Sequence, residues 1–234
     1  MEKKTLIFTA TYNESENIEK FLKIVDELNL NADILIIDDN SPDNTSKIIQ
    51  EYSKSKKNIH LITRNSKEGL DTAHKMAYEY SRRNNYEFLI TLDADLTHDP
   101  KKIPDFINEL NTNSFVIGSR YMEGGKTDMK GLRLFLSFFG NKFIKFILNV
   151  NCSEFTSSFR GFNLTTLGDF DLKIVSSKGY SFFMETIHLI SSSGYTIKQI
   201  PIHFSDRAKG ISKIPKVEIF RTLKNLFLLK FKKS

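Results

Sequence analysis

Two carboxylates separated by one residue follow an apolar stretch near the middle of the chain. Asp93 and Asp95 come directly after residues 88–92, which read Phe-Leu-Ile-Thr-Leu and are typical of a buried strand. Hard divalent cations such as Mg²⁺ and Mn²⁺ prefer carboxylate oxygens and share them with the phosphates of a substrate. The spacing therefore indicates a metal site that also binds a nucleoside diphosphate.

A second acidic pair, Asp38 and Asp39, ends the apolar run 34–37 in the same way. In α/β sheets the carboxyl ends of the strands meet at one edge, where ligands bind, so we expect both pairs to face one crevice. Short acidic motifs also arise by chance, and a carboxylate can simply cap the next helix. Asp99, directly before a proline, fits the capping role. Asp93 and Asp95 come too early for it.

The elements that must position these carboxylates alternate along the first half of the chain. Strand-like runs and helical patterns interleave at residues 6–10, 16–28, 34–37, 45–53, 59–63, 70–83, 88–92 and 115–118. Such alternation predicts right-handed βαβ units, hence an α/β fold with a mainly parallel, Rossmann-like central sheet. A chain of 234 residues with 40% hydrophobic residues suits one domain spanning 1–234.

Charge and cysteine content narrow the function classes. The net charge of +6 is compatible with nucleic acid, anionic lipid or a phosphorylated substrate as partner. A single cysteine, Cys152, excludes an intramolecular disulfide, and we expect it to be a small buried residue. The first apolar stretch is too short for a signal-peptide core, so we expect a cytoplasmic protein.

Two later segments carry apolar and basic residues together. Residues 131–150 are rich in Phe, Leu and Ile, yet several charges make a membrane-spanning helix unfavourable at about +3 kcal/mol per central charge. We expect amphipathic interface helices on a membrane surface, or two short helices broken at Gly140-Asn141; an ordinary buried helical hairpin is the alternative. Residues 215–234 predict a basic amphipathic helix that either packs on the domain or lies on anionic lipid.

Several motifs together resemble one family, the inverting family 2 glycosyltransferases of GT-A fold, and within it the polyprenol-phosphate (dolichol-phosphate) mannosyltransferases. The matching segments follow in family order at residues 10–14, 37–43, 93–100, 117–121, 156–160, 179–182 and 206–213. The chain departs from the family's usual residues at Ala10 (Pro), Asp71 (Gly) and Ser158 (Gly). Asp71 adds a negative charge near a loop that faces the donor.

The resemblance implies roles for named residues. It places the metal, Mg²⁺ or Mn²⁺, on Asp93 and Asp95, and makes Asp95, Arg120, Arg133 and Arg207 catalytic. The nucleotide site it implies consists of Thr11, Tyr12, Glu14, Asp38, Asp39, Asp93, Ala94 and Asp95. The acceptor-phosphate site it implies consists of Arg120, Arg133, Ser137, Arg207 and Lys213. Arg133 and Ser137 are four residues apart, so one helix would present both on one face.

Three further residues receive lesser roles. Glu185 occupies the position of the base in relatives that glycosylate alcohols; a phosphate acceptor is already anionic, so we expect a supporting role, such as orienting an arginine. His98 is either a third neighbour of the metal or, as we favour, a histidine of the turn before Asp99. Arg64 follows the strand-like run 59–63 and is a candidate to assist at the nucleotide.

The leading hypothesis is transfer of a sugar, mannose from GDP-mannose, to a polyprenyl or dolichyl phosphate with inversion. The enzyme would be peripheral on the cytoplasmic face of a membrane, with a separate membrane subunit left open. The enzymatic alternative uses a UDP-sugar such as UDP-glucose and a lipid phosphate or glycan. A phosphohydrolase would carry its acidic pair after the first strand, and a nucleotidyltransferase would open with a glycine-rich loop. A basic nucleic-acid- or membrane-binding module is the non-enzymatic alternative; carboxylates at strand ends argue against nucleic acid as partner.

Overall fold

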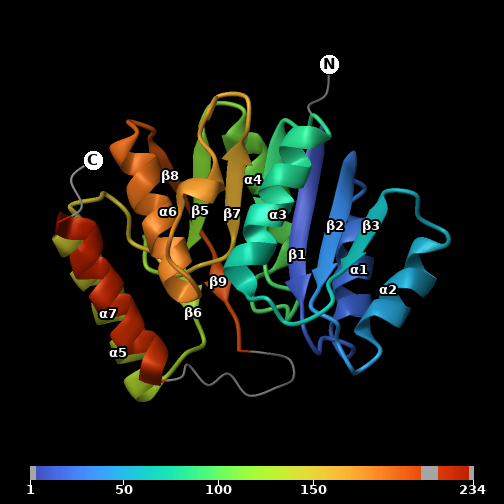
Figure 1. The fold of residues 1–234 in the computed structure, drawn as a ribbon, viewed down its shortest axis with the longest axis horizontal. Coiled ribbons are helices and arrows are strands. Elements are labelled where there is room, and N and C mark those ends of the chain that lie inside the picture. The colour runs from blue at the N-terminus through green and yellow to red at the C-terminus, as the bar shows by residue number, and fades with distance from the viewer. Residues whose placement is uncertain (1–3, 207–215, 232–234) are drawn as a thin grey trace.

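The computed structural model describes residues 4–206 and 216–231. In this part of the chain seven strands form one sheet in the order β3-β2-β1-β4-β7-β5-β8 (Figure 1). Their bounds are β1 Thr5–Thr11, β2 Ala32–Asp38, β3 Ile59–Thr63, β4 Phe88–Thr91, β5 Phe115–Ser119, β7 Arg160–Asn163 and β8 Ile197–Pro201. Only β7 runs antiparallel to its neighbours in this sheet. The predicted α/β fold with a mainly parallel sheet is confirmed.

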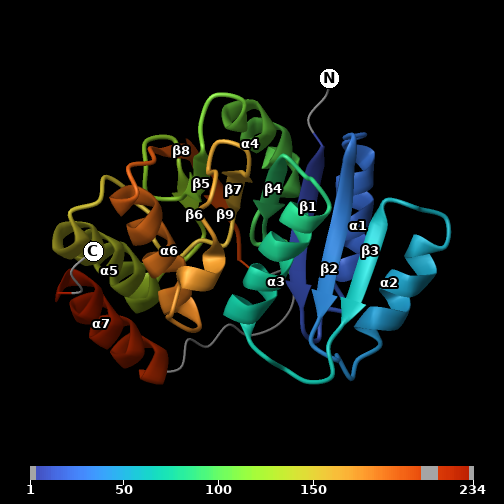
Figure 2. The same cartoon turned by 45° about the horizontal axis from the view of Figure 1, so that its top comes forward.

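Helices cover both faces of the sheet (Figures 1 and 2). On one face lie α1 (Ile18–Glu27), α2 (Thr45–Ser53), and α4 (Ile103–Leu110), which follows the short 3₁₀ turn Pro100–Lys102. On the other lie α3 (Leu70–Arg83) and α6 (Tyr180–Ser192), preceded by the 3₁₀ turn Leu172–Ile174, with α5 (Gly131–Leu148) and α7 (Lys216–Phe231) side by side at one end. A small parallel sheet joins β6 (Lys126–Thr127) to β9 (His203–Phe204).

Two apolar cores, one on each face of the sheet, explain why the strands read as continuous apolar runs. Along β1, Leu6 and Phe8 belong to the core under α3 and α6, whereas Ile7 belongs to the core under α1 and α4. Successive side chains alternate between faces, so a strand covered on both sides is apolar throughout. Because β1 runs parallel to both β2 and β4, the carboxyl ends of these three strands lie at one edge of the sheet.

The apolar segment after β6 differs from the expectation. Residues 131–148 form one helix, α5, so both the predicted break at Gly140-Asn141 and the buried hairpin are wrong. The Asn141 side chain is buried and hydrogen-bonded within the continuous helix: Nδ2 donates to the Ser137 carbonyl (2.8 Å) and Oδ1 accepts from the Phe155 amide (2.7 Å). Among the described residues no helix combines the length and apolarity needed to cross a membrane.

The C-terminal helix packs on the domain along one side only. Leu226 and Leu229 of α7 are buried in the core shared with α5 and α6, while Phe227, Leu228 and Phe231 remain exposed. The expected packing is therefore confirmed for one face of the helix. Cys152 is buried, as expected.

Candidate active site

The two carboxylates that follow β4 differ in their surroundings. The side chain of Asp93 is 38% exposed, whereas Asp95 is only 4% exposed and accepts hydrogen bonds from the Thr97 amide (3.1 Å) and hydroxyl (2.7 Å). Ala94 between them is buried. Leu96 adopts the left-handed conformation (φ 61°), which is costly for a residue with a branched side chain. The loop is thus held in a special conformation that keeps Asp93 accessible.

These carboxylates fit a hard divalent cation. Among the described residues no cluster of three or more His, Cys, Asp or Glu side chains could hold a metal ion by itself. Two carboxylates at a strand end nevertheless match the usual Mg²⁺ site, in which few protein ligands are completed by substrate phosphates and water. Asp93 and Asp95 would hold the ion against the diphosphate of a bound nucleotide.

His98 is a buried residue beneath this loop. Its Nδ1 lies 3.5 Å from Asp93 Oδ2, and its Nε2 lies 3.4 Å from Ser157 Oγ. Burial lowers the pKa of His98 to about 4, and the positive charge of Arg120 adds to this effect. The imidazole is therefore neutral at neutral pH. As expected, the neighbouring Asp99 caps the next turn, through a hydrogen bond from the Lys101 amide.

Asp38 organises the loops at the ends of β1 and β2. Its carboxylate is fully buried and accepts hydrogen bonds from the hydroxyls of Thr11 (2.7 Å), Ser41 (2.6 Å) and Ser46 (2.7 Å) and from the Ser41 amide (2.9 Å). Burial alone raises the pKa of Asp38, but these hydrogen bonds outweigh it and hold the pKa below its ordinary value of 3.8. Asp38 and Thr11 thus fix the loops at the ends of β1 and β2 from within.

Asp38→Asn is expected to lower the free energy of unfolding at pH 7 by about 2–3 kcal/mol, because the amide leaves at least one buried donor without an acceptor. The folded pKa lies below the unfolded one, so the wild-type stabilisation is complete above about pH 4 and is lost as the pH falls through the folded pKa. Urea unfolding at several pH values should therefore show that the difference in the free energy of unfolding between wild type and variant becomes smaller as the pH falls toward about 3. Asp105→Asn, which removes an exposed carboxylate, is the matched control. A difference that stays constant with pH would refute this role of Asp38.

Asp39 is paired with Arg64. Both Nε and Nη2 of this buried arginine contact Asp39 Oδ1, while Nη1 donates to Thr72 Oγ1 (2.5 Å) and Nη2 to the Gly69 carbonyl (3.1 Å). Arg64 thereby fixes the end of β2 to the start of α3. These contacts are structural, and the predicted assistance of Arg64 at the nucleotide stays a prediction.

Tyr12 presents an accessible ring in the loop that follows β1. The ring is 38% exposed, and the Lys67 ammonium lies 3.9 Å from its centroid. The Asn13 amide donates to Ser41 Oγ (3.0 Å) and the Glu14 amide to Thr45 Oγ1 (3.0 Å), which joins this loop to the loop after β2. An aromatic face held in this way can stack on a nucleobase.

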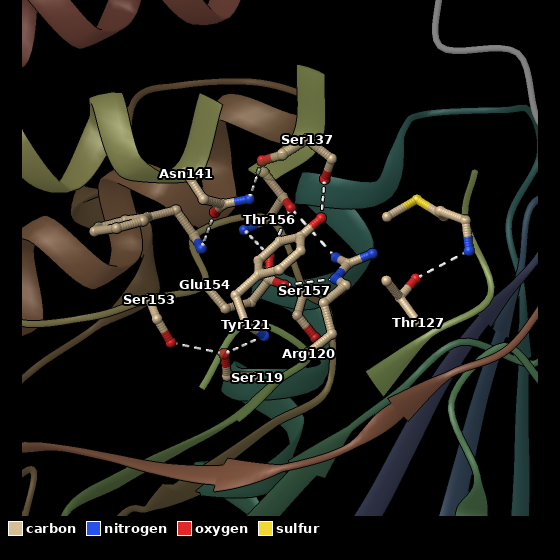
Figure 3. A network of polar contacts seen from close by, with 12 residues as sticks. Ser119, Arg120, Tyr121, Thr127, Ser137, Asn141, Ser153, Glu154, Thr156 and Ser157 are labelled. Carbon is tan, nitrogen blue, oxygen red and sulfur yellow. Dashed lines mark hydrogen bonds and ion pairs between the residues drawn. The ribbon is translucent and has the colours of Figure 1, made fainter. Parts of the chain in front are cut away.

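Two of the residues predicted to bind the acceptor phosphate, Arg120 and Ser137, lie near the end of β5 (Figure 3). Arg120 is buried directly after this strand, and the Tyr121 hydroxyl donates to Ser137 Oγ of α5 at 2.6 Å. Arg133 is exposed one turn earlier on α5, and its charge acts on Tyr121, whose pKa is raised by burial. The structure thus brings Arg120, Arg133 and Ser137 together. Arg207 and Lys213 lie outside the described residues.

Glu154 is a residue of this site that sequence reasoning missed. Its fully buried carboxylate accepts from Arg120 Nε at 2.6 Å (Figure 3). Burial alone raises the pKa of Glu154, but Arg120 and hydrogen bonds from Thr156 outweigh it, so the pKa is lowered. The one available signal was an acidic residue two positions before the motif at 156–160.

Glu185 has a supporting structural role among the described residues, and the expectation that it orients an arginine stays a prediction because Arg207 lies outside them. The buried carboxylate accepts hydrogen bonds from the amides of Ser176 (3.1 Å) and Ser177 (2.6 Å). Asp71 is likewise buried and accepts from the Gly179 amide (3.1 Å). Gly179 has φ 59° and ψ −139°, a conformation reserved for glycine. Asp71 and Glu185 therefore fix the loop that enters α6.

Residues 6–169 match the glycosyl transferase family 2 family, and the chain therefore belongs to glycosyltransferase family 2. It is 31% identical to a polyprenol monophosphomannose synthase of Mycolicibacterium smegmatis, over 90% of this chain and 81% of that protein. It is 30% identical to an undecaprenyl-phosphate mannosyltransferase of Micrococcus luteus, over 90% of this chain and 87% of that protein.

Solved structures share the fold at low sequence identity. A glucosyl-3-phosphoglycerate synthase from Mycobacterium tuberculosis in complex with UDP matches with a TM-score of 0.69 and 13% identity, over 99% of this chain and 82% of that one. A mannosyltransferase from Pyrobaculum calidifontis in complex with GDP-Man and Mn²⁺ matches with a TM-score of 0.61 and 16% identity, over 98% and 64% of the two chains. At these identities the likeness concerns the fold.

Proposed function

We propose that this family 2 glycosyltransferase moves a sugar, mannose from GDP-mannose, to a polyprenyl phosphate with inversion at the anomeric carbon. The observation that carries the proposal is the meeting of opposite charges at one edge of the sheet. Asp93 Oδ2, after β4, lies 3.5 Å from His98 Nδ1, and the His98 ring centroid lies 5.4 Å from that of Phe204. The same Phe204 ring lies 4.2 Å from Cζ of Arg120, after β5. A carboxylate suited to a metal diphosphate thus lies near a cation suited to an acceptor phosphate. The names of the two relatives near 30% identity support this acceptor.

In the proposed reaction different residues bind the donor diphosphate and the acceptor phosphate, and no general base is needed. Asp93 and Asp95 would hold Mg²⁺ or Mn²⁺, which would supply Lewis-acid stabilisation of the departing nucleoside diphosphate. Arg120, Arg133 and Ser137 hold and orient the acceptor phosphate, whose oxygen is already anionic at neutral pH, so catalysis consists largely of positioning. The hydrogen bonds to buried Glu185 agree with this scheme, because they hold that carboxylate as a structural acceptor.

The donor is the less constrained half of the proposal. Tyr12, Glu14 and Asp39 surround the place proposed for the nucleoside, and nothing in their chemistry distinguishes guanine from uracil. A UDP-sugar such as UDP-glucose is therefore the alternative, and the fold neighbours include one complex with GDP-Man and Mn²⁺ and one with UDP. Family membership argues against a module without enzymatic activity.

A membrane surface is the proposed site of encounter with the lipid acceptor. The exposed face of α5 is apolar: Leu132, Leu136, Phe139 and Phe143 recur at helical spacing, and Phe146 is 79% exposed. The opposite, buried face carries Asn141, Ile144 and Leu148.

This apolar face continues onto α7 and carries basic residues. The ring centroids of Phe143 and Phe227 are 6.5 Å apart, which makes the exposed apolar surfaces of α5 and α7 contiguous. Exposed cations accompany them at Lys142, Lys145, Lys224 and Lys230. Apolar insertion and attraction to anionic headgroups add, the latter at about 1 kcal/mol per basic residue near the surface. We place this surface, which lies beside Ser137 and Arg133, on the cytoplasmic face of a membrane.

The direct test incubates the protein with Mg²⁺ or Mn²⁺, a short polyprenyl phosphate and a panel of GDP- and UDP-sugars, followed by mass measurement of the lipid product. We expect a single added hexose from GDP-mannose. Product from a UDP-sugar alone would move the donor to the alternative. Absence of product from every donor, at low salt and with anionic liposomes present, would contradict the proposal or require a separate membrane subunit, which co-purification from membranes would reveal.

Arg133→Ala is expected to reduce kcat/KM for the lipid phosphate by about 10- to 100-fold, the effect of losing a charge-assisted hydrogen bond, while nucleotide affinity stays nearly unchanged. Kinetics with the lipid and calorimetry with GDP would separate the two effects. Arg83→Ala removes an exposed arginine from the end of α3, outside both the proposed site and the proposed membrane surface, and serves as the control. Equal losses on the nucleotide and lipid sides would remove Arg133 from the acceptor site.

A further inference from the structure

We propose that Glu154 is a positioning residue, which holds the guanidinium of Arg120 in the orientation that receives the acceptor phosphate. This inference rests on the proposed function and adds to it a residue whose motif gave no role. Glu154 lies in the loop between α5 and β7, and in this scheme it contacts Arg120 and not the ligand.

The two carboxylate oxygens of Glu154 have separate tasks. Oε2 accepts from Arg120 Nε at 2.6 Å, while Oε1 accepts from the Thr156 amide (3.1 Å) and hydroxyl (2.7 Å). The carboxylate is fully buried, so neither contact competes with water. The hydrogen bonds to Oε1 hold the carboxylate in its own loop, and the hydrogen bond to Oε2 holds Nε of the Arg120 guanidinium.

The other sides of the Arg120 guanidinium are also restrained. The ring of Phe204 in β9 lies 4.2 Å from Cζ, and Nη2 is 3.5 Å from Thr156 Oγ1. The strand that carries Phe204 is joined to the loop after β4, because the Ser205 amide donates to the Thr97 carbonyl (3.0 Å). Within the described part of the chain, Nε and Nη2 have hydrogen-bond partners and Nη1 has none. It is the donor that this arrangement leaves for a phosphate oxygen.

The loop that carries Glu154 is fixed to α5, which bears the rest of the acceptor site. The Phe155 amide donates to Asn141 Oδ1 on α5 at 2.7 Å. Arg160, fully buried, donates from Nε to the Ser157 carbonyl (2.8 Å) and from Nη2 to the Phe155 carbonyl (3.3 Å). Glu154 therefore sets where Arg120 lies relative to Ser137 and Arg133. A charge-assisted hydrogen bond from this guanidinium to a phosphate oxygen depends on such placement.

A double-mutant cycle tests this role. Glu154→Gln keeps a hydrogen-bond acceptor for Arg120 and removes the charge. We expect kcat/KM for the polyprenyl phosphate to fall by about 10- to 100-fold, with GDP affinity unchanged within about twofold. In an Arg120→Gln background the same substitution should change kcat/KM by less than about twofold, because Glu154 acts through Arg120. Asp26→Asn, which breaks the pair with Lys56 at the far side of the molecule, is the control.

Three outcomes would overturn the inference. Glu154→Gln could lower kcat/KM in the Arg120→Gln background as much as in the wild type, it could lower GDP affinity as much as kcat/KM, or it could leave kcat/KM unchanged. If Glu154→Gln does not fold, Thr156→Ala, which deletes the hydroxyl that holds Oε1, replaces it with the same criteria. Calorimetry with a short alkyl phosphate, in the presence of GDP and Mg²⁺, separates this inference from the proposed function. If the wild type transfers no sugar, the proposed function fails. Alkyl phosphate binding still tests the role of Glu154: weaker binding by Glu154→Gln supports this role, and equal binding refutes it.

Discussion

Asp93→Asn is expected to reduce metal-dependent sugar transfer by about 100-fold or more, while thermal unfolding stays close to that of the wild type. Asp93 is the accessible member of the carboxylate pair after β4. Loss of a charged ligand to a cation that stabilises a leaving diphosphate costs several kcal/mol, and each 1.36 kcal/mol is tenfold in rate. Nucleotide binding should consequently lose most of its dependence on Mg²⁺ or Mn²⁺, as calorimetry with and without metal would show.

Asp95→Asn should lose the same activity and, in addition, stability. Asp95 is buried and accepts two hydrogen bonds from Thr97, so its replacement also disturbs the loop that keeps Asp93 accessible. We expect a loss of about 1–3 kcal/mol in the free energy of unfolding. The exposed Asp105→Asn is the control for both variants. If Asp93→Asn retains wild-type turnover and metal dependence, the metal site lies elsewhere.

Replacing three exposed aromatic residues of α5 with serine, at Phe135, Phe139 and Phe146, is expected to weaken binding to anionic liposomes by at least about 100-fold. Full burial of a phenylalanine side chain stabilises by about 1.5–3 kcal/mol. A 100-fold change in affinity corresponds to about 2.8 kcal/mol, so inserting most of the area of three rings accounts for the expected loss. Because the removed side chains are exposed in the folded protein, the free energy of unfolding should change little. Liposome sedimentation and urea unfolding measure the two quantities.

The control for this variant is Ile174→Ser, which removes an apolar side chain of comparable exposure from a different part of the surface. Binding of the wild type should also weaken as salt is raised, because the cations beside the apolar face contribute through a screened interaction. Wild-type binding that is absent at low salt would exclude this surface as a membrane contact. Equal losses for the control would mean that α5 has no special part in binding.

The elements with strong local patterns were predictable from the sequence. Helices α2 and α3 and strand β3 occupy the predicted ranges 45–53, 70–83 and 59–63. Here apolar periodicity, turn residues and burial agree, so each segment has one favourable structure whatever its neighbours do. The acidic pairs at strand ends were predictable for the same reason, since strand direction places their carboxylates at one edge.

The continuity of α5 was not predictable, because it depends on a partner distant in sequence. Gly140-Asn141 is a good helix end by local criteria. The Phe155 amide, fourteen residues later, donates a hydrogen bond to the buried Asn141 side chain, so this residue is accommodated inside the helix and does not end it. The exposed position of the apolar face of α5 likewise follows from which side of the helix packs on the domain.

The sequence by itself determined the class of fold, the carboxylates after β2 and β4, and the family to which the chain belongs. Tertiary structure alone decided which charges are paired: Glu154 with Arg120, Arg64 with Asp39, and Asp71 with the Gly179 amide. The physical reason is that backbone pattern and strand direction are local properties. The partner of a buried charge is instead chosen by segments far apart in the chain, which must satisfy every polar atom that they exclude from water.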